Sequence, residues 1–313
     1  RRVGAAASGD VSSWQWQMFR ETFKFGSKIQ APTRPPSSEL LVIGAGLPRT
    51  GTDSLRMALD HLGYHTYHAQ YINQEGHHPM WKDLFEVSLA GKDIANEIDL
   101  AINALLEAGY TATTDAPTCL LTAQLAKRFP NAKIILSVRD SPEIWAESFG
   151  STIGMIFAQM VREPLKMLLA DKVGPLSDYL EMQLGRKIEY NPGRRPKKES
   201  LALAYEYWID HIQSEVDSSR LLLHNSKDGW DPICKFLEIS FDKRPHIPYP
   251  YTNSKSDWRM IVAIVCFLSD IWPMLPWIGA VFFIVGTVKL LKSNIHFGTM
   301  LKTKALSTEK KEK

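Results

Sequence analysis

Apolar runs alternate with segments of helical pattern along the middle of the chain. The run ELLVIGAG (39–46) ends at glycines and predicts a buried strand. The segment DSLRMALDHLG (53–63) has leucine and alanine at helical spacing and ends at a glycine, as many helices do. NAKIILSVRD (131–140) and PEIWAESFG (142–150) repeat this order of strand and helix. The alternation predicts an α/β fold, in which helices cover both faces of a parallel sheet.

Weaker patterns extend this alternation. Residues 98–109 and 120–130 predict two more helices, and a proline stops the second one. Residues 108–117 predict a strand and a loop. Residues 151–215 are mostly helical in pattern, and the basic loop 189–200 interrupts them. We therefore expect one α/β domain over most of the chain.

A long apolar segment lies near the C-terminus. In MIVAIVCFLSDIWPMLPWIGAVFFIVGTV (260–288) the only charged residue is Asp270. Crossing a bilayer core takes about 20 apolar residues, so this segment predicts membrane association. It could form a single span, or a hairpin that turns at Pro273 to Pro276. Basic residues flank both ends, so they leave the orientation open.

These patterns divide the chain into four parts. Residues 1–38 are expected to be flexible, because 31–39 is rich in Pro and Ser. The domain occupies 39–259, the membrane segment 260–288 and a Lys-rich tail 289–313. The Arg, Ala and Ser near the start faintly match a transit peptide, and an untidy terminus is the alternative. The tail could lie along anionic lipid or be solvated.

Composition excludes several classes of protein. Hydrophobic residues make up 44% and charged residues 23%, which rules out a wholly disordered or collagen-like chain. The net charge of +3 does not favour a nucleic-acid binder. Three cysteines are too few and too dispersed for a disulfide framework or a zinc site, and they fit a reducing compartment.

The clearest chemical signal is VIGAGLPRTGTDSL (42–55), where a strand leads through a glycine-rich loop into a helix. Such a turn directs backbone N–H groups and the positive end of the helix at an anion, and Arg49 adds a bidentate donor. The nucleotide triphosphatase form GxxxxGK[ST] is absent, because Thr52 follows Gly51 and the loop contains no Lys. The dinucleotide form GxGxxG is absent too, because Arg49 replaces its third glycine.

The loop's PRTGT (48–52) resembles the phosphosulfate loop of the sulfotransferases, whose common cytosolic form is PKSGT. The longer pattern GAGxxRTGTxSL is most similar to a sulfotransferase-like branch found in fungi, algae and plants. The resemblance implies a P-loop NTPase-like fold of three layers, α/β/α, around a parallel sheet. It also implies that 3′-phosphoadenosine 5′-phosphosulfate binds to this loop, through Pro48, Arg49, Thr50, Gly51, Thr52, Asp53 and Ser54.

A second signature of that family is a strand that ends in Arg, followed by a helix that carries Ser. IILSVRDSPEIWAES (134–148) is similar to it, which implies that Arg139 and Ser148 bind the donor's 3′-phosphate. Ligands of open α/β sheets bind at the C-terminal ends of strands, which suits Arg139. The spacing to Ser148 is one residue longer than in cytosolic enzymes. As an alternative, Arg139 could pair with Asp140 or Glu143.

The identity of the general base stays open. Asp115 stands where the resembling stretch of the family has a His that deprotonates the acceptor, and Thr113 replaces the family's Lys. A carboxylate with a reference pKa of about 3.9 is a weak base unless burial raises that value. Asp115 could instead cap the following helix. His65 and His68 lie near the next strand; His68 is the second candidate base, and a purely structural role is the alternative.

The resemblance covers about residues 39–259. Its closing part, DGWDPICKFLEIS followed by PYPYTNSKSDWR, matches the branch at Trp230, Pro232, Leu237 and Asn253. We expect Trp230 to have a packing role and Asn253 to lie near the donor.

The sequence thus predicts a membrane-associated sulfotransferase with a cytosolic catalytic domain. It would transfer a sulfuryl group from 3′-phosphoadenosine 5′-phosphosulfate to a hydroxyl or amine of a small acceptor, with Arg49, Asp115 and His68 as catalytic residues. The membrane segment 260–288 would suit a lipophilic acceptor such as a sterol. No metal and no nucleic-acid partner are expected, and the oligomeric state stays open. The alternatives are a small-molecule kinase or NTPase, and a non-catalytic, membrane-anchored nucleotide-binding scaffold.

Overall fold

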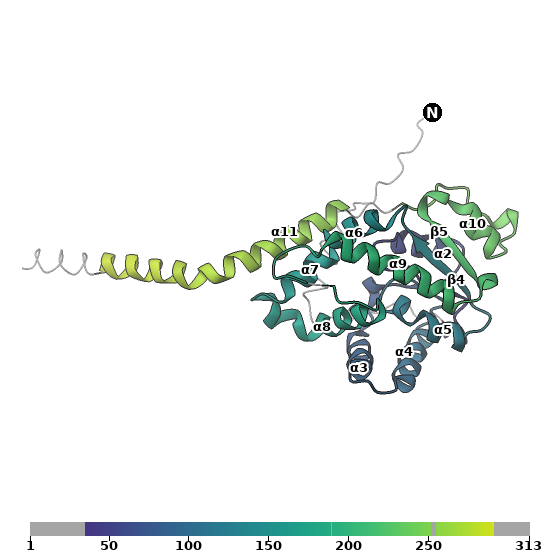
Figure 1. Cartoon of the computed structure of the whole chain (residues 1–313), viewed down its shortest axis with the longest axis horizontal. Coiled ribbons are helices and arrows are strands. Elements are labelled where there is room, and N and C mark those ends of the chain that lie inside the picture. The colour runs from purple at the N-terminus through teal and green to yellow at the C-terminus, as the bar shows by residue number, and fades with distance from the viewer. Residues whose placement is uncertain (1–34, 189, 252–254, 291–313) are drawn as a thin grey trace, which may run out of the picture. The chain divides into compact units, whose positions relative to one another are not determined.

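The computed structural model describes residues 35–188, 190–251 and 255–290 (Figure 1). The expected flexible segment, up to residue 34, and the tail from residue 291 lie outside the described residues. The chain forms two compact units, Arg1–Val265 and Cys266–Lys313.

A five-stranded sheet occupies the centre of the first unit, with the strand order β2-β3-β1-β4-β5. Every neighbouring pair of strands is parallel, so the carboxyl ends of all strands share one edge. The predicted parallel sheet is therefore confirmed. The strands are β1 Val42–Gly44, β2 Thr66–Tyr67, β3 Ala112–Thr113, β4 Lys133–Val138 and β5 Leu221–Asn225.

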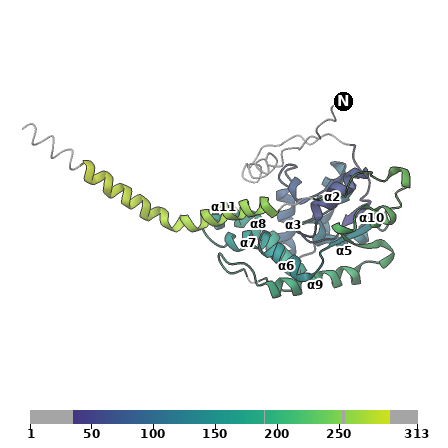
Figure 2. The same ribbon diagram turned by 90° about the horizontal axis from the view of Figure 1, so that it is seen from above.

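Helices connect the strands and cover both faces of the sheet. The indole of Trp145 in α6 stacks on Tyr205 in α9 with ring centroids 4.9 Å apart, so these two helices run side by side (Figure 2). The helices are α2 Thr52–His61, α3 His78–Leu89, α4 Ala95–Glu107, α5 Thr122–Arg128, α6 Pro142–Gly150, α7 Ile153–Met160, α8 Leu165–Gln183, α9 Lys198–Glu215, α10 Trp230–Phe236 and α11 Lys255–Ile271. Short 3-10 helices are η1 Ala69–Tyr71, η2 Thr118–Leu121, η3 Ser218–Arg220, η4 Ser226–Asp228, η5 Phe241–Lys243 and η6 Trp272–Met274.

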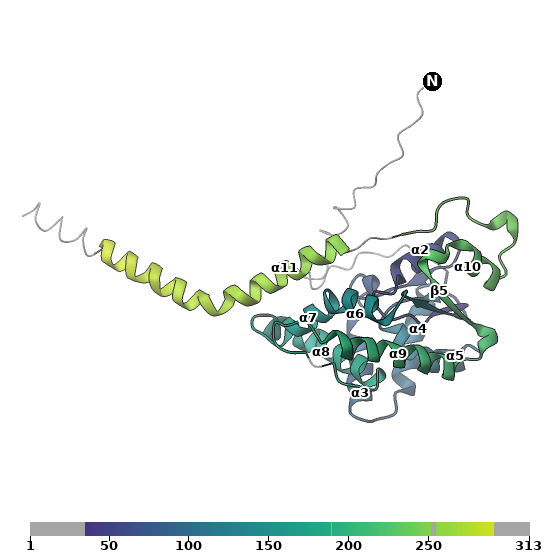
Figure 3. The ribbon, with the colours of Figure 1, turned by 45° about the horizontal axis from the view of Figure 1, so that its top comes forward.

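Alternate strand residues face two separate hydrophobic clusters. Val42 and Ile135 pack with Leu55 of α2 and with α10, whereas Ile43 and Ile134 belong to the larger cluster that includes α5 and α9. This division follows from the two-residue period of a strand. Figure 3 shows α2 and α10 on one side of the sheet and α5 and α9 on the other. The three-layer α/β/α architecture is thereby confirmed.

Two details of the predicted elements differ from the structure. The expected helix 120–130 is divided into η2 Thr118–Leu121 and α5 Thr122–Arg128. Strand β5 was not predicted, because Leu221–Asn225 is a short run without alternation in which Leu223 is exposed. The predicted interruption of the helical pattern is present, because α8 ends at Gln183 and α9 begins at Lys198, which lies within the expected loop 189–200.

One helix of the described chain, Trp258–Leu290, is long and apolar enough to cross a membrane by length and composition. At 33 residues it spans roughly 50 Å, more than the ~30 Å of a bilayer core. The 3-10 turn Trp272–Met274 interrupts it at Pro273, and the helix then continues. The hairpin alternative is therefore wrong: the prolines produce a short 3-10 turn without reversing the chain.

Candidate functional site

The phosphate loop joins β1 to α2 at the carboxyl edge of the sheet. Two of its residues have left-handed backbone conformations, Arg49 with φ 76° and Gly51 with φ 95°. That conformation costs a residue with a side chain roughly 1–2 kcal/mol, and glycine avoids the cost. Gly51 also lies against Ser226, because a Cβ at residue 51 would be 2.4 Å from that side chain's Oγ. The strain at Arg49 indicates that its surroundings determine its position.

Two buried tryptophans, one in α6 and one in α9, donate hydrogen bonds to this loop. The indole N–H of Trp145 donates to the carbonyl of Pro48, and that of Trp208 donates to the carbonyl of Ala45, each at 2.9 Å. Both indoles are almost fully buried. Sequence reasoning did not assign them to the site; the family motif around Arg139 contains Trp145, but nothing in the pattern marks Trp208.

Close packing beneath the loop requires Gly46. A Cβ at this residue would lie 1.9 Å from Oγ of Ser137 and 2.7 Å from Oγ1 of Thr50. The Thr50 hydroxyl donates to the Leu47 carbonyl at 2.7 Å and lies 2.7 Å from the Ser137 hydroxyl. Thr50 therefore uses its side chain to hold the loop itself together.

A chain of three polar side chains begins at the first residue of α2. Oγ1 of Thr52 lies 3.5 Å from Nε2 of His68, and the same nitrogen lies 3.3 Å from Oδ2 of Asp115. The backbone N–H of Gln70 donates to Nδ1 of His68 at 3.3 Å. Since Nδ1 accepts a hydrogen bond, the proton of the neutral ring is at Nε2 and points at the carboxylate. The structure thus brings together both residues that compete as general base, and His68 serves as the donor.

One carboxylate oxygen of Asp115 is not used in the contact with His68. Its Oδ1 is buried and has no hydrogen-bond partner among the described residues. Burial raises the pKa of this carboxyl above its ordinary value, and the opposing effects of His68, of the backbone N–H of Ala116 and of Arg49 are smaller. The helical turn η2 Thr118–Leu121 has Pro117 at its N-cap position and no side-chain cap, so the capping alternative for Asp115 is wrong. An ionised Asp115 can accept a proton at Oδ1.

Arg139 and Ser148 each have a buried polar atom without a hydrogen-bond partner among the described residues. These atoms are Nε of Arg139 and Oγ of Ser148. The backbone N–H of Arg139 donates to the hydroxyl of Tyr205 at 2.9 Å, which fixes the end of β4 against α9. The Asp140 carboxylate pairs with Lys227 and accepts a hydrogen bond from Asn225, and among the described residues Arg139 forms no ion pair with Asp140 or Glu143.

Two further residues of the predicted donor-binding loop lie in the first turn of α2. The carboxylate of Asp53 accepts a hydrogen bond from Nε of Arg56 at 2.9 Å. Arg56 also donates to Asp60 at 2.9 Å, so one arginine is shared by two carboxylates along the helix. Ser54 is buried within the same turn.

His224 is a polar residue that sequence reasoning missed. It lies on β5 opposite Ser137 and is 1% exposed, and neither ring nitrogen has a hydrogen-bond partner among the described residues. Burial lowers its pKa to about 4, so the ring is neutral at physiological pH. Recognising Leu221–Asn225 as a strand beside β4 could have identified His224 as a candidate site residue, because the carboxyl ends of parallel strands lie at the same edge of a sheet.

The other histidines of the first helical region have structural partners. His65 stacks on Tyr110 with ring centroids 4.0 Å apart and bonds to the carbonyl of Gly109. His77 lies 3.2 Å from the hydroxyl of Tyr67. The indole of Trp230 donates to the carbonyl of Ile247, in agreement with a packing role. The predicted position of Asn253 lies outside the described residues.

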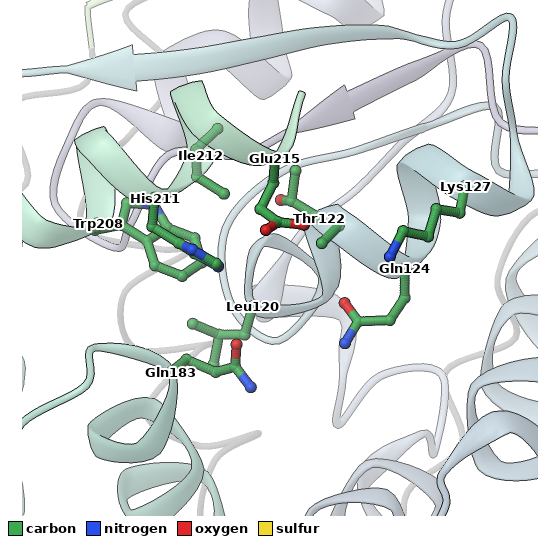
Figure 4. A pocket seen from close by; sticks show the side chains of 10 residues that line it. Leu120, Thr122, Gln124, Lys127, Gln183, Trp208, His211, Ile212 and Glu215 are labelled. Carbon is green, nitrogen blue, oxygen red and sulfur yellow. The ribbon is translucent and has the colours of Figure 1, made fainter. Parts of the chain in front are cut away.

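A pocket of about 290 Å³ lies on the α5 and α9 side of the sheet (Figure 4). None of the predicted site residues lines it. It approaches the phosphate loop only through Trp208, whose indole bonds to the loop. The lining residues are Leu120, Thr122, Ala123, Gln124, Lys127, Gln183, Trp208, His211, Ile212 and Glu215.

Comparison with known proteins gives consistent matches. Residues 41–258 match the family described as "Sulfotransferase domain". The "Ava biosynthesis cluster protein M" of Aspergillus versicolor is 28% identical over 220 residues, which cover 66% of this chain and 80% of that protein. A similar solved structure is the sulfotransferase domain from the olefin synthase of Synechococcus PCC 7002, with 18% identity, 69% of this chain and 79% of that chain covered, and a TM-score of 0.29. The family match includes all of the site residues described above.

Proposed function

Because the chain belongs to the sulfotransferase domain family, we propose that it transfers a sulfuryl group from 3′-phosphoadenosine 5′-phosphosulfate to a hydroxyl or amine of a small acceptor. The observation that carries the proposal is the Asp115 carboxylate. It is buried, its Oδ1 lacks a partner among the described residues, and its other oxygen faces His68 at 3.3 Å. This is the arrangement of a proton acceptor next to an anion-binding loop.

The residues present fit the donor. Its 3′-phosphate supplies acceptor oxygens for Nε of Arg139 and the hydroxyl of Ser148, both of which lack partners among the described residues. The N-terminus of α2 and the guanidinium of Arg49 would meet its 5′-phosphosulfate. The two sets of contacts would hold the donor at both ends and so orient the sulfuryl group.

The reaction then follows from where charge moves. Asp115 takes the proton of the acceptor hydroxyl through Oδ1, while the hydroxyl oxygen forms a bond to sulfur. The bond between sulfur and the bridging oxygen breaks, and its electron pair passes to the 5′-phosphate of the leaving nucleotide. Arg49 and the backbone N–H groups of the loop stabilise the charge that develops there. His68 holds the Asp115 carboxylate in place through its Nε2–H.

The test is calorimetric binding of 3′-phosphoadenosine 5′-phosphate, the spent donor, to the full chain in detergent. Arg49→Ala and Arg139→Ala should each weaken binding about 10- to 100-fold, the effect of losing a charge-assisted hydrogen bond. Arg128→Ala is the control, because Arg128 pairs with Asp99 on another helix. ATP with magnesium is tested beside it. Tighter binding of ATP with magnesium than of the spent donor would favour a kinase or NTPase. Binding of neither ligand by folded protein would favour a scaffold.

We also propose that the helix Trp258–Leu290 anchors the protein in a membrane, with the catalytic domain in the cytosol. Its length and composition support the proposal. Large apolar side chains along it are exposed, among them Phe282 at 74% and Phe283 at 76%. An anchored domain would suit an acceptor that is dissolved in the bilayer.

A further inference from the structure

The arginine of the phosphate loop contacts the residue at which the apolar helix begins. Cζ of Arg49 lies 5.7 Å from the ring centroid of Trp258, within the range of a cation–π interaction. Both side chains are partly buried. They belong to the same compact unit, Arg1–Val265. No motif of the sequence connects these two residues, which only the folded chain brings together.

The first turns of this helix are held in the core of that unit. Val265 is 3% exposed within the larger hydrophobic cluster, and Ile261 packs against the same cluster. Residues three and four positions apart lie on one face of a helix, so Trp258, Ile261 and Val265 form a single stripe. Burial of the last two therefore determines where the indole of the first one lies.

This contact suits an arginine that must bind an anion. An aromatic ring contacts the face of a guanidinium, whereas phosphate or sulfate oxygens bind the N–H groups at its edge, so the two kinds of contact are compatible. A long side chain otherwise loses rotamer entropy when it binds, and a fixed contact removes part of that loss beforehand. The left-handed backbone of Arg49, with φ 76°, already restricts where its side chain can point.

We propose that Trp258 is a positioning residue for the donor site: its indole holds the guanidinium of Arg49 where the 5′-phosphosulfate binds. The inference rests on the proposed function. It also means that the first residue of the candidate membrane helix contributes to donor binding.

The experiment measures binding of 3′-phosphoadenosine 5′-phosphate to the full chain in detergent by calorimetry. Trp258→Leu keeps an apolar side chain but removes the aromatic face, and it should weaken binding about 3- to 30-fold, the range expected for a lost cation–π contact. Trp258→Phe should restore most of the affinity. Trp277→Leu is the control, since Trp277 lies on the same helix with 77% of its surface exposed, and it should bind as the wild type does.

A double-mutant cycle separates positioning from general damage. In an Arg49→Ala background, Trp258→Leu should change the affinity less than twofold, because the residue on which it acts is gone. Equal losses in both backgrounds, or equal binding by Trp258→Leu and Trp277→Leu, would overturn the inference. Failure of the wild type to bind the nucleotide would instead contradict the proposed function. Thermal unfolding of each variant verifies that it is folded. If Trp258→Leu does not fold, Trp258→Met repeats the test, because methionine also fills the space without an aromatic face.

Discussion

At the scale of single residues, burial determines what the Asp115 carboxyl can do. Removal from water raises its pKa, while the Nε2–H of His68 holds one of its oxygens at 3.3 Å. A raised pKa makes a carboxylate a stronger base, which overcomes the main objection to an aspartate in this role. The motif identified Asp115 and His68 as alternatives, but the tautomer of His68 depends on the Gln70 N–H and could not be predicted from the sequence.

Replacing Asp115 by Asn tests this assignment. We expect Asp115→Asn to bind 3′-phosphoadenosine 5′-phosphate as the wild type does, and to lose transfer by roughly 10²- to 10⁴-fold, the usual contribution of a general base. The measurement is single-turnover sulfuryl transfer once an acceptor has been found by screening. If Asp115→Asn remained fully active, the base would have to be sought elsewhere.

The pH dependence of the rate follows from the same shift. Transfer needs an ionised Asp115, so kcat/KM should rise with pH through the folded-state pKa of this carboxyl, which lies above the ordinary value of 3.8. A pH–rate profile of the wild type should therefore show an acid limb above pH 3.8. An acid limb at or below that value would mean that burial does not control this group.

Ionisation of Asp115 has opposite effects on activity and on stability: rising pH should increase kcat/KM and lower the free energy of unfolding. Because the folded-state pKa is raised, protonation of this carboxyl stabilises the folded state fully below the unfolded pKa, and this contribution is lost as pH rises through the folded pKa. Asp115→Asn should therefore have a higher Tm than the wild type at pH 7, and the difference should shrink in acid. Thermal unfolding across pH measures this, and an equal Tm at every pH would contradict it.

At the scale of elements, the phosphate loop is held from three directions. Gly46 permits contact with Ser137 of β4, and two indoles bond to its carbonyls from α6 and α9. The strand, loop and helix could be predicted because their signal is local. The supports could not, because Trp208 is 163 residues away from its partner and its own helical pattern carries no sign of the contact.

Alanine in place of Gly46 should destabilise the domain by about 1–3 kcal/mol, because its Cβ would lie 1.9 Å from Oγ of Ser137. Gly279, on the candidate membrane helix, is the control: a Cβ there meets nothing within 4 Å, so Gly279→Ala should leave the unfolding of the domain unchanged. Urea unfolding of the full chain in detergent compares the two variants. Equal stability of both variants would mean that packing beneath the loop is looser than described.

At the scale of the whole molecule, the sequence predicted the fold class and the apolar segment better than it predicted the individual strands and the course of the C-terminal helix. The parallel sheet followed from alternating elements, whereas β5 escaped notice because Leu221–Asn225 has neither alternation nor a continuous buried run. The prolines near Trp272–Met274 left a hairpin or a single helix open. Local composition cannot decide this, because a proline can end a helix or merely interrupt it.

The anchor makes a prediction of its own. Phe282→Arg places a charge on an exposed face of the apolar helix and should move the protein from the membrane fraction to the soluble fraction, at a cost of about 2.5–3.5 kcal/mol for insertion. Phe241→Arg is the control, because Phe241 is 79% exposed outside that helix. Flotation of the full chain with vesicles compares them. Identical flotation of both variants would contradict membrane insertion through this helix.

The bond between Trp208 and Ala45 also has a temporal consequence during synthesis. The N-terminal part of a chain leaves the ribosome first, so the loop emerges before Trp208, which lies 163 residues later than Ala45. At about 5–20 residues per second, the delay amounts to many seconds. Until α9 has left the exit tunnel, the nascent loop lacks its final support. The loop can therefore reach its final arrangement only after α9 has emerged, when strands β1 to β4 have already been made.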